Sequence, residues 1–184
     1  KVTSYDKIEP RLDNFDFIEG LLCDANISIF YGKPKSGKTL FVVDMALHVS
    51  AGLEFFGREV EQGGVLYFAL EGSAVVLNRI AAFKKHHSYE EKNFYFWLVN
   101  DPIDLLSNDF DVVRICELVQ KLSKDNDIPI RMIVIDTWSR ANPGGQENTG
   151  DTNEAFANVD AIVRATGAHV CIVHHEGKDS SHSP

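Results

Sequence analysis

The sequence predicts an α/β fold in which helices cover both faces of a mostly parallel central sheet. Short apolar runs typical of buried strands alternate with longer segments whose apolar residues recur at helical spacing. Because parallel strands require a long crossover, usually a helix, this alternation indicates repeated βαβ units. A glycine-rich loop follows one apolar run, and acidic residues end two later runs. Both features are typical of sheets that bind ligands at the carboxyl ends of their strands.

The composition is that of a single globular domain over residues 1–184, with 44% hydrophobic and 24% charged residues. No apolar run approaches the ~20 residues of a membrane helix, and the N-terminus lacks a signal-peptide pattern. We therefore expect a cytoplasmic protein with no membrane contact. The net charge of -9 argues against a broad basic face, so any nucleic acid must be held by a few loops or by several subunits together.

The most specific motif is the octapeptide GKPKSGKT at residues 32–39, which matches the phosphate-binding loop G-x-x-x-x-G-K-[ST] of nucleoside triphosphatases. Gly32 and Gly37 allow the tight turns that aim backbone N–H groups at a triphosphate. Lys38 places an ammonium between the β- and γ-phosphates, and the Thr39 hydroxyl is a ligand for Mg²⁺. The cofactors expected are ATP and Mg²⁺. The predicted nucleotide-binding residues are Gly32, Lys33, Pro34, Lys35, Ser36, Gly37, Lys38, Thr39 and Leu40.

The flanks of this loop match the motif. Residues 27–31 form a β-branched and aromatic run, as a buried strand should, and an apolar helical pattern follows the loop and ends near Ala51-Gly52. The alternative, a glycine turn with an incidental lysine, does not require strand, loop and helix in this order. The order therefore favours a nucleotide site.

The rest of the chain continues the alternation. The further elements predicted are a strand at 65–70, a helix from Ser73 to about His87, a strand at 94–99, a helix at about 111–124, a strand at 132–137, a polar loop from Ser139 to Asn153, a helix at about 152–165 and a strand at 168–173.

Carboxylates mark two of these strand ends. Glu71 ends the strand at 65–70, and Asp136 follows a run of large apolar residues, as in the second motif of nucleotide sites. The carboxyl ends of parallel strands share one edge of a sheet, so both acids can converge on the phosphate loop. Asp136 is then expected to hold Mg²⁺ through water. The alternative for a lone acid, a strand cap in solvent, is disfavoured by the complete phosphate loop.

Two adjacent histidines, His174 and His175, end the last strand. Side chains alternate along an extended chain, so one histidine can face the nucleotide while the other points away. A metal site is disfavoured because adjacent histidines are poor chelates and no Cys or acid lies at zinc-like spacing.

Together these motifs resemble the RecA-like P-loop ATPases, and within them the RepA-like hexameric replicative helicases of plasmids and phages. The resemblance covers most of the chain. The segments that carry it are the lead-in from Phe15 to Leu22, the phosphate loop from Gly32 to Thr39, the strand and acid from Val65 to Gly72, Ile135-Asp136-Thr137 and His174-His175-Glu176-Gly177-Lys178.

The resemblance implies catalytic roles for Glu71, Lys38 and His175. Glu71 would orient or deprotonate the attacking water, while Lys38, Thr39-bound Mg²⁺ and Asp136 stabilise charge on the phosphoryl group. His175 would sense the γ-phosphate, with His174 as the fallback.

The resemblance also implies partners: a homo-oligomer in the form of a hexameric ring, and single-stranded DNA in its channel. The segment from Ser139 to Asn153 and the tail from Glu176 would face that channel, with Arg140 and Lys178 as their positive charges.

The sequence departs from this group in one respect. Group members continue past the histidine motif with further strands, which carry an arginine that reaches a neighbour's ATP, whereas this sequence stops at Pro184. We therefore expect one RecA-like domain that lacks its C-terminal strands, with Arg79 as a substitute for that arginine. Two rival functions stay open: a regulatory ATPase that uses nucleotide as a switch, and a small-molecule kinase, for which no suitable arginine cluster is found.

Overall fold

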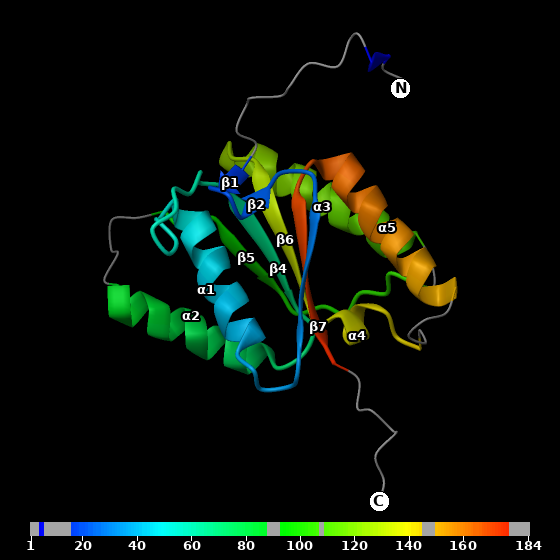
Figure 1. The fold of residues 1–184 in the computed structure, drawn as a ribbon, viewed down its shortest axis with the longest axis horizontal. Helices are drawn as coiled ribbons and strands as arrows, with labels where there is room; N and C mark the ends of the chain where they lie inside the picture. The colour runs from blue at the N-terminus through cyan, green and yellow to red at the C-terminus, as the bar shows by residue number, and fades with distance from the viewer. Residues whose placement is uncertain (1–3, 6–15, 88–92, 107–108, 145–149, 177–184) are drawn as a thin grey trace, which may run out of the picture.

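A computed structural model of the chain describes residues 4–5, 16–87, 93–106, 109–144 and 150–176. Its centre is a five-stranded parallel sheet in the order β3-β7-β6-β4-β5 (Figure 1). The strands of this sheet are β3 (Ile27–Gly32), β4 (Gly64–Ala69), β5 (Phe96–Val99), β6 (Ile130–Asp136) and β7 (His169–His175). The helices are α1 (Lys38–Ala51), α2 (Ser73–His87), α3 (Phe110–Asn126), α4 (Trp138–Ala141) and α5 (Gly150–Thr166).

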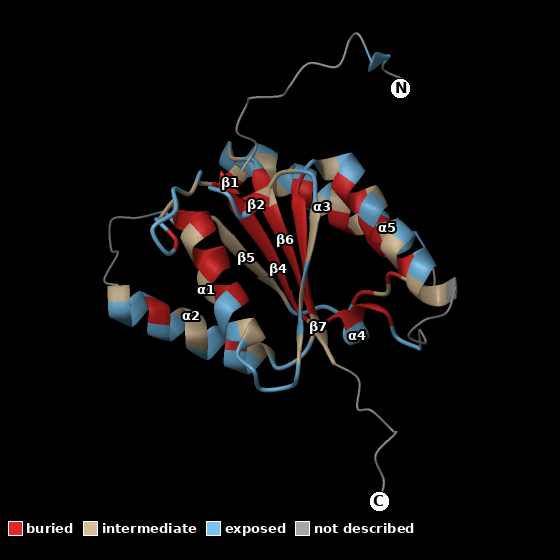
Figure 2. Cartoon of the chain, viewed as in Figure 1, coloured by how far each residue is buried: buried red, intermediate tan, exposed pale blue. Residues whose placement is uncertain are grey.

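Helices cover both faces of the sheet, as the sequence predicts. Alternate residues of β6 belong to two separate apolar clusters: Met132 and Val134 pack with α1 and α2, whereas Ile133 and Ile135 pack with α3 and α5. Burial on both faces explains why these strands read as continuous apolar runs. Figure 2 shows the central strands β4, β6 and β7 as largely buried and the edge strand β3 as more exposed. Within the described segments, no helix is long and apolar enough to cross a bilayer.

The predicted end of α1 near Ala51-Gly52 is confirmed. Gly52 adopts a left-handed conformation (φ 60°), and its N–H donates to the carbonyl groups of His48 and Val49. A Cβ atom on Gly52 would lie 2.9 Å from the Cβ of Gln62, so glycine is needed here for space as well as for backbone conformation. The local sequence thus determines where this helix stops.

The prediction of a loop from Ser139 to Asn153 is wrong at both ends. Residues 138–141 form α4, and α5 already begins at Gly150. Apolar side chains explain the short helix, because Trp138 and Ala141 are buried and the Trp138 ring packs 4.7 Å from that of Phe156 on α5. Residues 145–149 of this segment lie outside the described residues.

The lead-in segment forms a small antiparallel hairpin that sequence reasoning did not predict. It consists of β1 (Asp16–Ile18) and β2 (Leu22–Cys23), and Ile18 also bridges to Val60. Phe15, part of the same lead-in, lies outside the described residues.

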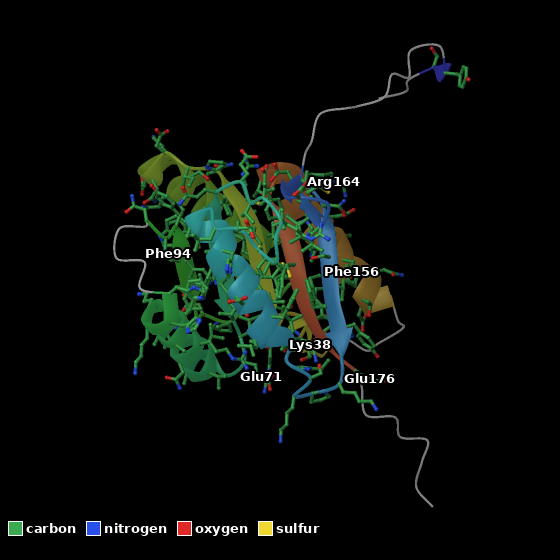
Figure 3. The ribbon with its side chains drawn as sticks, turned by 60° about the vertical axis from the view of Figure 1, so that its left-hand side comes forward. Lys38, Glu71, Phe94, Phe156, Arg164 and Glu176 are labelled. Carbon is green, nitrogen blue, oxygen red and sulfur yellow. The ribbon has the colours of Figure 1, made fainter. Side chains whose placement is uncertain are left out.

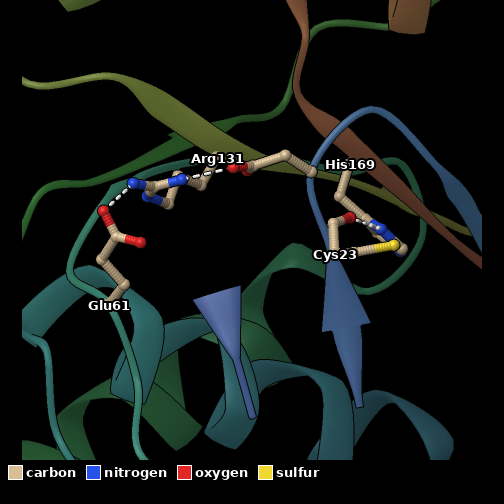
Figure 4. Close-up of polar contacts among 5 residues, drawn as sticks. Cys23, Glu61, Arg131 and His169 are labelled. Carbon is tan, nitrogen blue, oxygen red and sulfur yellow. Dashed lines mark hydrogen bonds and ion pairs between the residues drawn. The ribbon is translucent and has the colours of Figure 1, made fainter. Parts of the chain in front are cut away.

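Polar contacts attach this hairpin to the sheet (Figure 4). His169 on β7 contacts the Cys23 carbonyl through Nδ1 at 2.8 Å and the Ser28 hydroxyl through Nε2 at 2.9 Å. Arg131 on β6 pairs with Asp24 and Glu61. The carbonyl can only accept, so Nδ1 carries the proton and Nε2 accepts from Ser28. His169 is therefore held neutral between two partners.

We expect the stability of the fold to fall in mild acid. Burial lowers the pKa of His169 below its ordinary value of 6.5. Below pH 6.5, His169 is therefore protonated more readily in the unfolded chain than in the folded chain. The free energy of unfolding should then decrease as the pH drops from about 7 to 5. Denaturant unfolding at several pH values measures this slope. His169→Gln should flatten it; a slope equal to that of the parental protein would contradict the prediction.

Candidate functional site

The phosphate loop lies between the end of β3 and the start of α1 and curls around the ammonium group of Lys38. The Lys38 Nζ atom donates to the carbonyl oxygens of Gly32 at 2.7 Å and Lys33 at 2.8 Å. Three loop residues, Gly32 (φ 153°), Lys35 (φ 65°) and Gly37 (φ 92°), adopt positive φ angles, and the last two produce the tight turn before the helix. Residues 33–37 are exposed. The loop therefore presents the positive end of α1 and an ammonium to solvent, as an anion site requires.

A cavity of about 210 Å³ opens beside this loop. Its lining consists of Lys35, Ser36, Gly37, Lys38, Thr39, Arg79 and His175. The structure thus brings His175, 136 residues along the chain from Thr39 (175 − 39), into contact with the predicted phosphate site. Leu40, also predicted to bind nucleotide, lies outside this lining and is 54% exposed.

Arg79 on α2 adds a third side-chain cation to the cavity, beside Lys35 and Lys38. Its Nη1 atom is buried and has no hydrogen-bond partner among the described residues. A buried guanidinium nitrogen without an acceptor is costly, and a phosphate oxygen in the cavity would supply one. The electrostatics of the cavity therefore favour a polyanion.

Thr39 and Asp136 lie together at the base of the loop. The Thr39 hydroxyl donates to Asp136 Oδ1 at 3.4 Å, and Asp136 is 1% exposed. Burial raises the pKa of Asp136, while hydrogen bonds from Tyr67 and Thr39 act in the opposite direction. A hydroxyl beside a carboxylate oxygen is a donor set that suits Mg²⁺. These two residues therefore fit the metal that accompanies a nucleoside triphosphate.

Glu71 lies just beyond β4, next to the end of β6. Ala69 pairs with Asp136 in the β4–β6 register, and the Leu70 N–H donates to the Asp136 carbonyl at 2.7 Å. The Thr137 hydroxyl donates to Glu71 Oε2 at 3.2 Å. Figure 3 shows Lys38 and Glu71 at the same end of the molecule. The sheet thus brings the two predicted acids to adjacent strand ends, with the Glu71 side chain exposed to solvent.

The two histidines at the end of β7 face opposite sides of the sheet. His175 lines the phosphate cavity. The His174 ring lies 5.5 Å from that of Tyr31 and lines a separate cavity of about 480 Å³ together with Trp138 and Phe156. Alternation along the strand produces this division.

The chain after His175 returns to the phosphate loop. The Glu176 N–H donates to the Gly32 carbonyl at 3.1 Å, the same oxygen that accepts from Lys38. Gly177 and Lys178, the rest of the predicted motif, lie outside the described residues. The Gly32 carbonyl group therefore links the residue that follows β7 to the phosphate loop through hydrogen bonds.

Sequence reasoning missed two hydroxyl groups of the site, those of Tyr67 and Thr137. Each contacts a carboxylate that lies 66 or more positions away in the chain: Tyr67 donates to Asp136, and Thr137 to Glu71. The sequence holds no local signal for either contact, since both depend on the pairing of β4 with β6.

Comparisons with known proteins agree with this geometry. A family model described as an AAA domain matches residues 5–181. The structure is similar to that of a KaiC-like protein from the hyperthermophilic archaeon Pyrococcus horikoshii, with a TM-score of 0.54 and 15% sequence identity over 90% of this chain and 68% of that one. A search of curated proteins finds no match. At such low identity the structural likeness establishes the RecA-like P-loop fold, and neither finding separates RepA-like helicases from other ATPases of this type.

Proposed function

We propose that this chain, which belongs to the AAA domain family, is the MgATP-binding and ATP-hydrolysing core of a RepA-like replicative helicase. The observation that carries the proposal is one cavity lined by the phosphate loop, Arg79 and His175, in which Thr39 also donates a hydrogen bond to Asp136. Loop, metal residues and strand-end histidine are the parts that a nucleotide-driven motor needs in one place.

In the nucleotide step, each group acts on a different part of the triphosphate. The loop N–H groups and Lys38 bind the β- and γ-phosphates, and Arg79 supplies further positive charge. Thr39 and Asp136 would hold Mg²⁺, which would supply positive charge to neutralise the phosphate oxygens. Glu71, held by Thr137, orients or deprotonates the attacking water.

The helicase part of the proposal depends on the strand ends. β6 and β7 carry Asp136 and His175 at their tips and lead into the two segments assigned to single-stranded DNA, residues 139–153 and the tail from Glu176. Exposed Arg140 lies on the first of them. A hexameric ring would add such segments from six copies, which compensates for the acidic net charge of -9 on each chain. The alternative, a regulatory ATPase switched by nucleotide, is favoured by that same acidity.

The ATPase rate of the full-length gene product, measured with and without single-stranded DNA, tests the proposal. We expect MgATP hydrolysis that single-stranded DNA accelerates, and a ring-sized particle by light scattering in the presence of nucleotide. An ATPase rate that single-stranded DNA does not change, in a protein that stays monomeric, would favour the regulatory alternative.

The proposal also predicts that His175→Ala uncouples the ATPase rate from the presence of single-stranded DNA. A neutral imidazole can hydrogen-bond the γ-phosphate and loses that partner on hydrolysis, so the Glu176 tail would be anchored differently in the ATP and ADP states. We expect His175→Ala to leave nucleotide affinity within a small factor while removing DNA stimulation of the ATPase. His174→Ala is the matched control, because its ring faces the other side of the sheet. DNA stimulation that survives in His175→Ala and disappears in His174→Ala would assign the role to His174.

A further inference from the structure

Tyr67 is buried in the middle of β4, with 0% exposure, in an otherwise apolar cluster. Its ring stacks on that of Phe96 at 5.8 Å. The phenol hydroxyl donates to Asp136 Oδ2 at 2.7 Å, the shorter of the two side-chain hydrogen bonds that Asp136 accepts among the described residues. A buried hydroxyl needs a partner, and this one uses an oxygen of the predicted metal-site acid.

The pairing of β4 with β6 explains how Tyr67 reaches that acid. Tyr67 pairs with Val134, and Ala69 pairs with Asp136. Residues two apart on a strand share a face, so Tyr67 and Asp136 are diagonal neighbours on the face that α1 covers. Ala69, directly opposite Asp136, has a small side chain that leaves the carboxylate accessible to the long tyrosine. The arrangement therefore arises from a large and a small residue placed at alternate positions.

The two oxygens of Asp136 have different partners as a result. Oδ2 accepts from Tyr67, and Oδ1 accepts from Thr39 at the start of α1. A carboxylate held at one oxygen cannot rotate freely about its terminal bond, so its second oxygen stays directed at the Thr39 hydroxyl. Groups that hold metal ligands in this way usually matter for metal affinity as much as for fold.

We propose that Tyr67 is a positioning residue for the Mg²⁺ site: it fixes the Asp136 carboxylate so that Oδ1 faces Thr39, the other residue that would hold the metal. The inference rests on the proposed MgATP function and adds to it a role for a residue to which the sequence motifs assign none. A purely structural tyrosine would affect stability alone, whereas a positioning tyrosine affects how strongly Mg²⁺ promotes nucleotide binding.

The test compares ADP affinity with Mg²⁺ and with EDTA, by calorimetry, in the parental protein and in Tyr67→Phe. Phenylalanine keeps the ring and its packing, so the variant should fold, which circular dichroism checks. We expect unchanged affinity for metal-free ADP and a Mg²⁺ requirement shifted to roughly 10- to 100-fold higher concentration, as is usual when a partner of a metal ligand is lost. Tyr95→Phe is the control, because it removes a phenol hydroxyl from a half-buried ring that packs beside Trp97.

A second variant shows whether Tyr67 acts through Asp136. Asp136→Ala should itself weaken the Mg²⁺ effect, and adding Tyr67→Phe to it should cost nothing further, because alanine leaves the Tyr67 hydroxyl no oxygen at that position. Two results would overturn this inference and leave the proposed function standing. One is a folded Tyr67→Phe variant with the same Mg²⁺ requirement as the parental protein. The other is a Tyr67→Phe substitution that weakens the Mg²⁺ effect as much in the Asp136 variant as in the parental protein. Absence of any Mg²⁺ effect on ADP binding in the parental protein would instead overturn the proposed function, and the inference with it.

Discussion

Lys38→Ala is expected to abolish tight ATP binding. The Lys38 ammonium is the cation that the phosphate loop encloses, within 2.8 Å of two loop carbonyl oxygens. The motif assigns the contact with the β- and γ-phosphates to Lys38 alone. Lys33 and Lys35 are exposed residues of the loop, although Lys35 also lines the cavity. Without Lys38 the loop retains its N–H groups but loses the charge that a triphosphate requires.

Calorimetry with MgATP measures this effect. The matched control is Lys85→Ala, which removes an exposed lysine from α2 and leaves the loop untouched. Equal affinity in Lys38→Ala and the parental protein would remove the basis for assigning residues 32–39 to nucleotide binding.

Glu71→Gln is expected to bind ATP normally and to lower turnover by roughly 10²-fold or more, the usual consequence of losing a general base or water-orienting carboxylate. Glutamine has nearly the same size, and its amide oxygen can still accept from the Thr137 hydroxyl that contacts Glu71 Oε2 at 3.2 Å. The substitution thus removes the basicity of the side chain with little change to its position.

Steady-state ATPase assays combined with ATP-binding measurements separate the two effects. Glu54→Gln, at an exposed position in the connection between α1 and β4, is the control. If Glu71→Gln hydrolyses ATP at the parental rate, the base lies elsewhere and Asp136 is the next residue to substitute.

The sequence alone was sufficient for several features that depend on neighbouring residues, although it did not predict the hairpin of β1 and β2. The phosphate loop is contiguous, so its motif, its flanking strand and its helix can be recognised without knowing the rest of the fold. The bounds of α2 and the end of α1 at Gly52 also agree with prediction, since helical periodicity and a left-handed glycine are local properties. Alternation along β7 likewise indicated that His174 and His175 would separate, though not which of them would face the loop.

Tertiary structure decided which distant residues meet. The pairing of β4 with β6 places Tyr67 against Asp136 and Thr137 against Glu71, and the packing of α2 beside α1 brings Arg79 to the phosphate cavity. Packing also converted part of the predicted loop into α4, because Trp138 is buried against α5. The physical reason is common to all of these: strand order and helix packing result from burying apolar faces over the whole chain, and a local pattern holds no information about which face lies opposite.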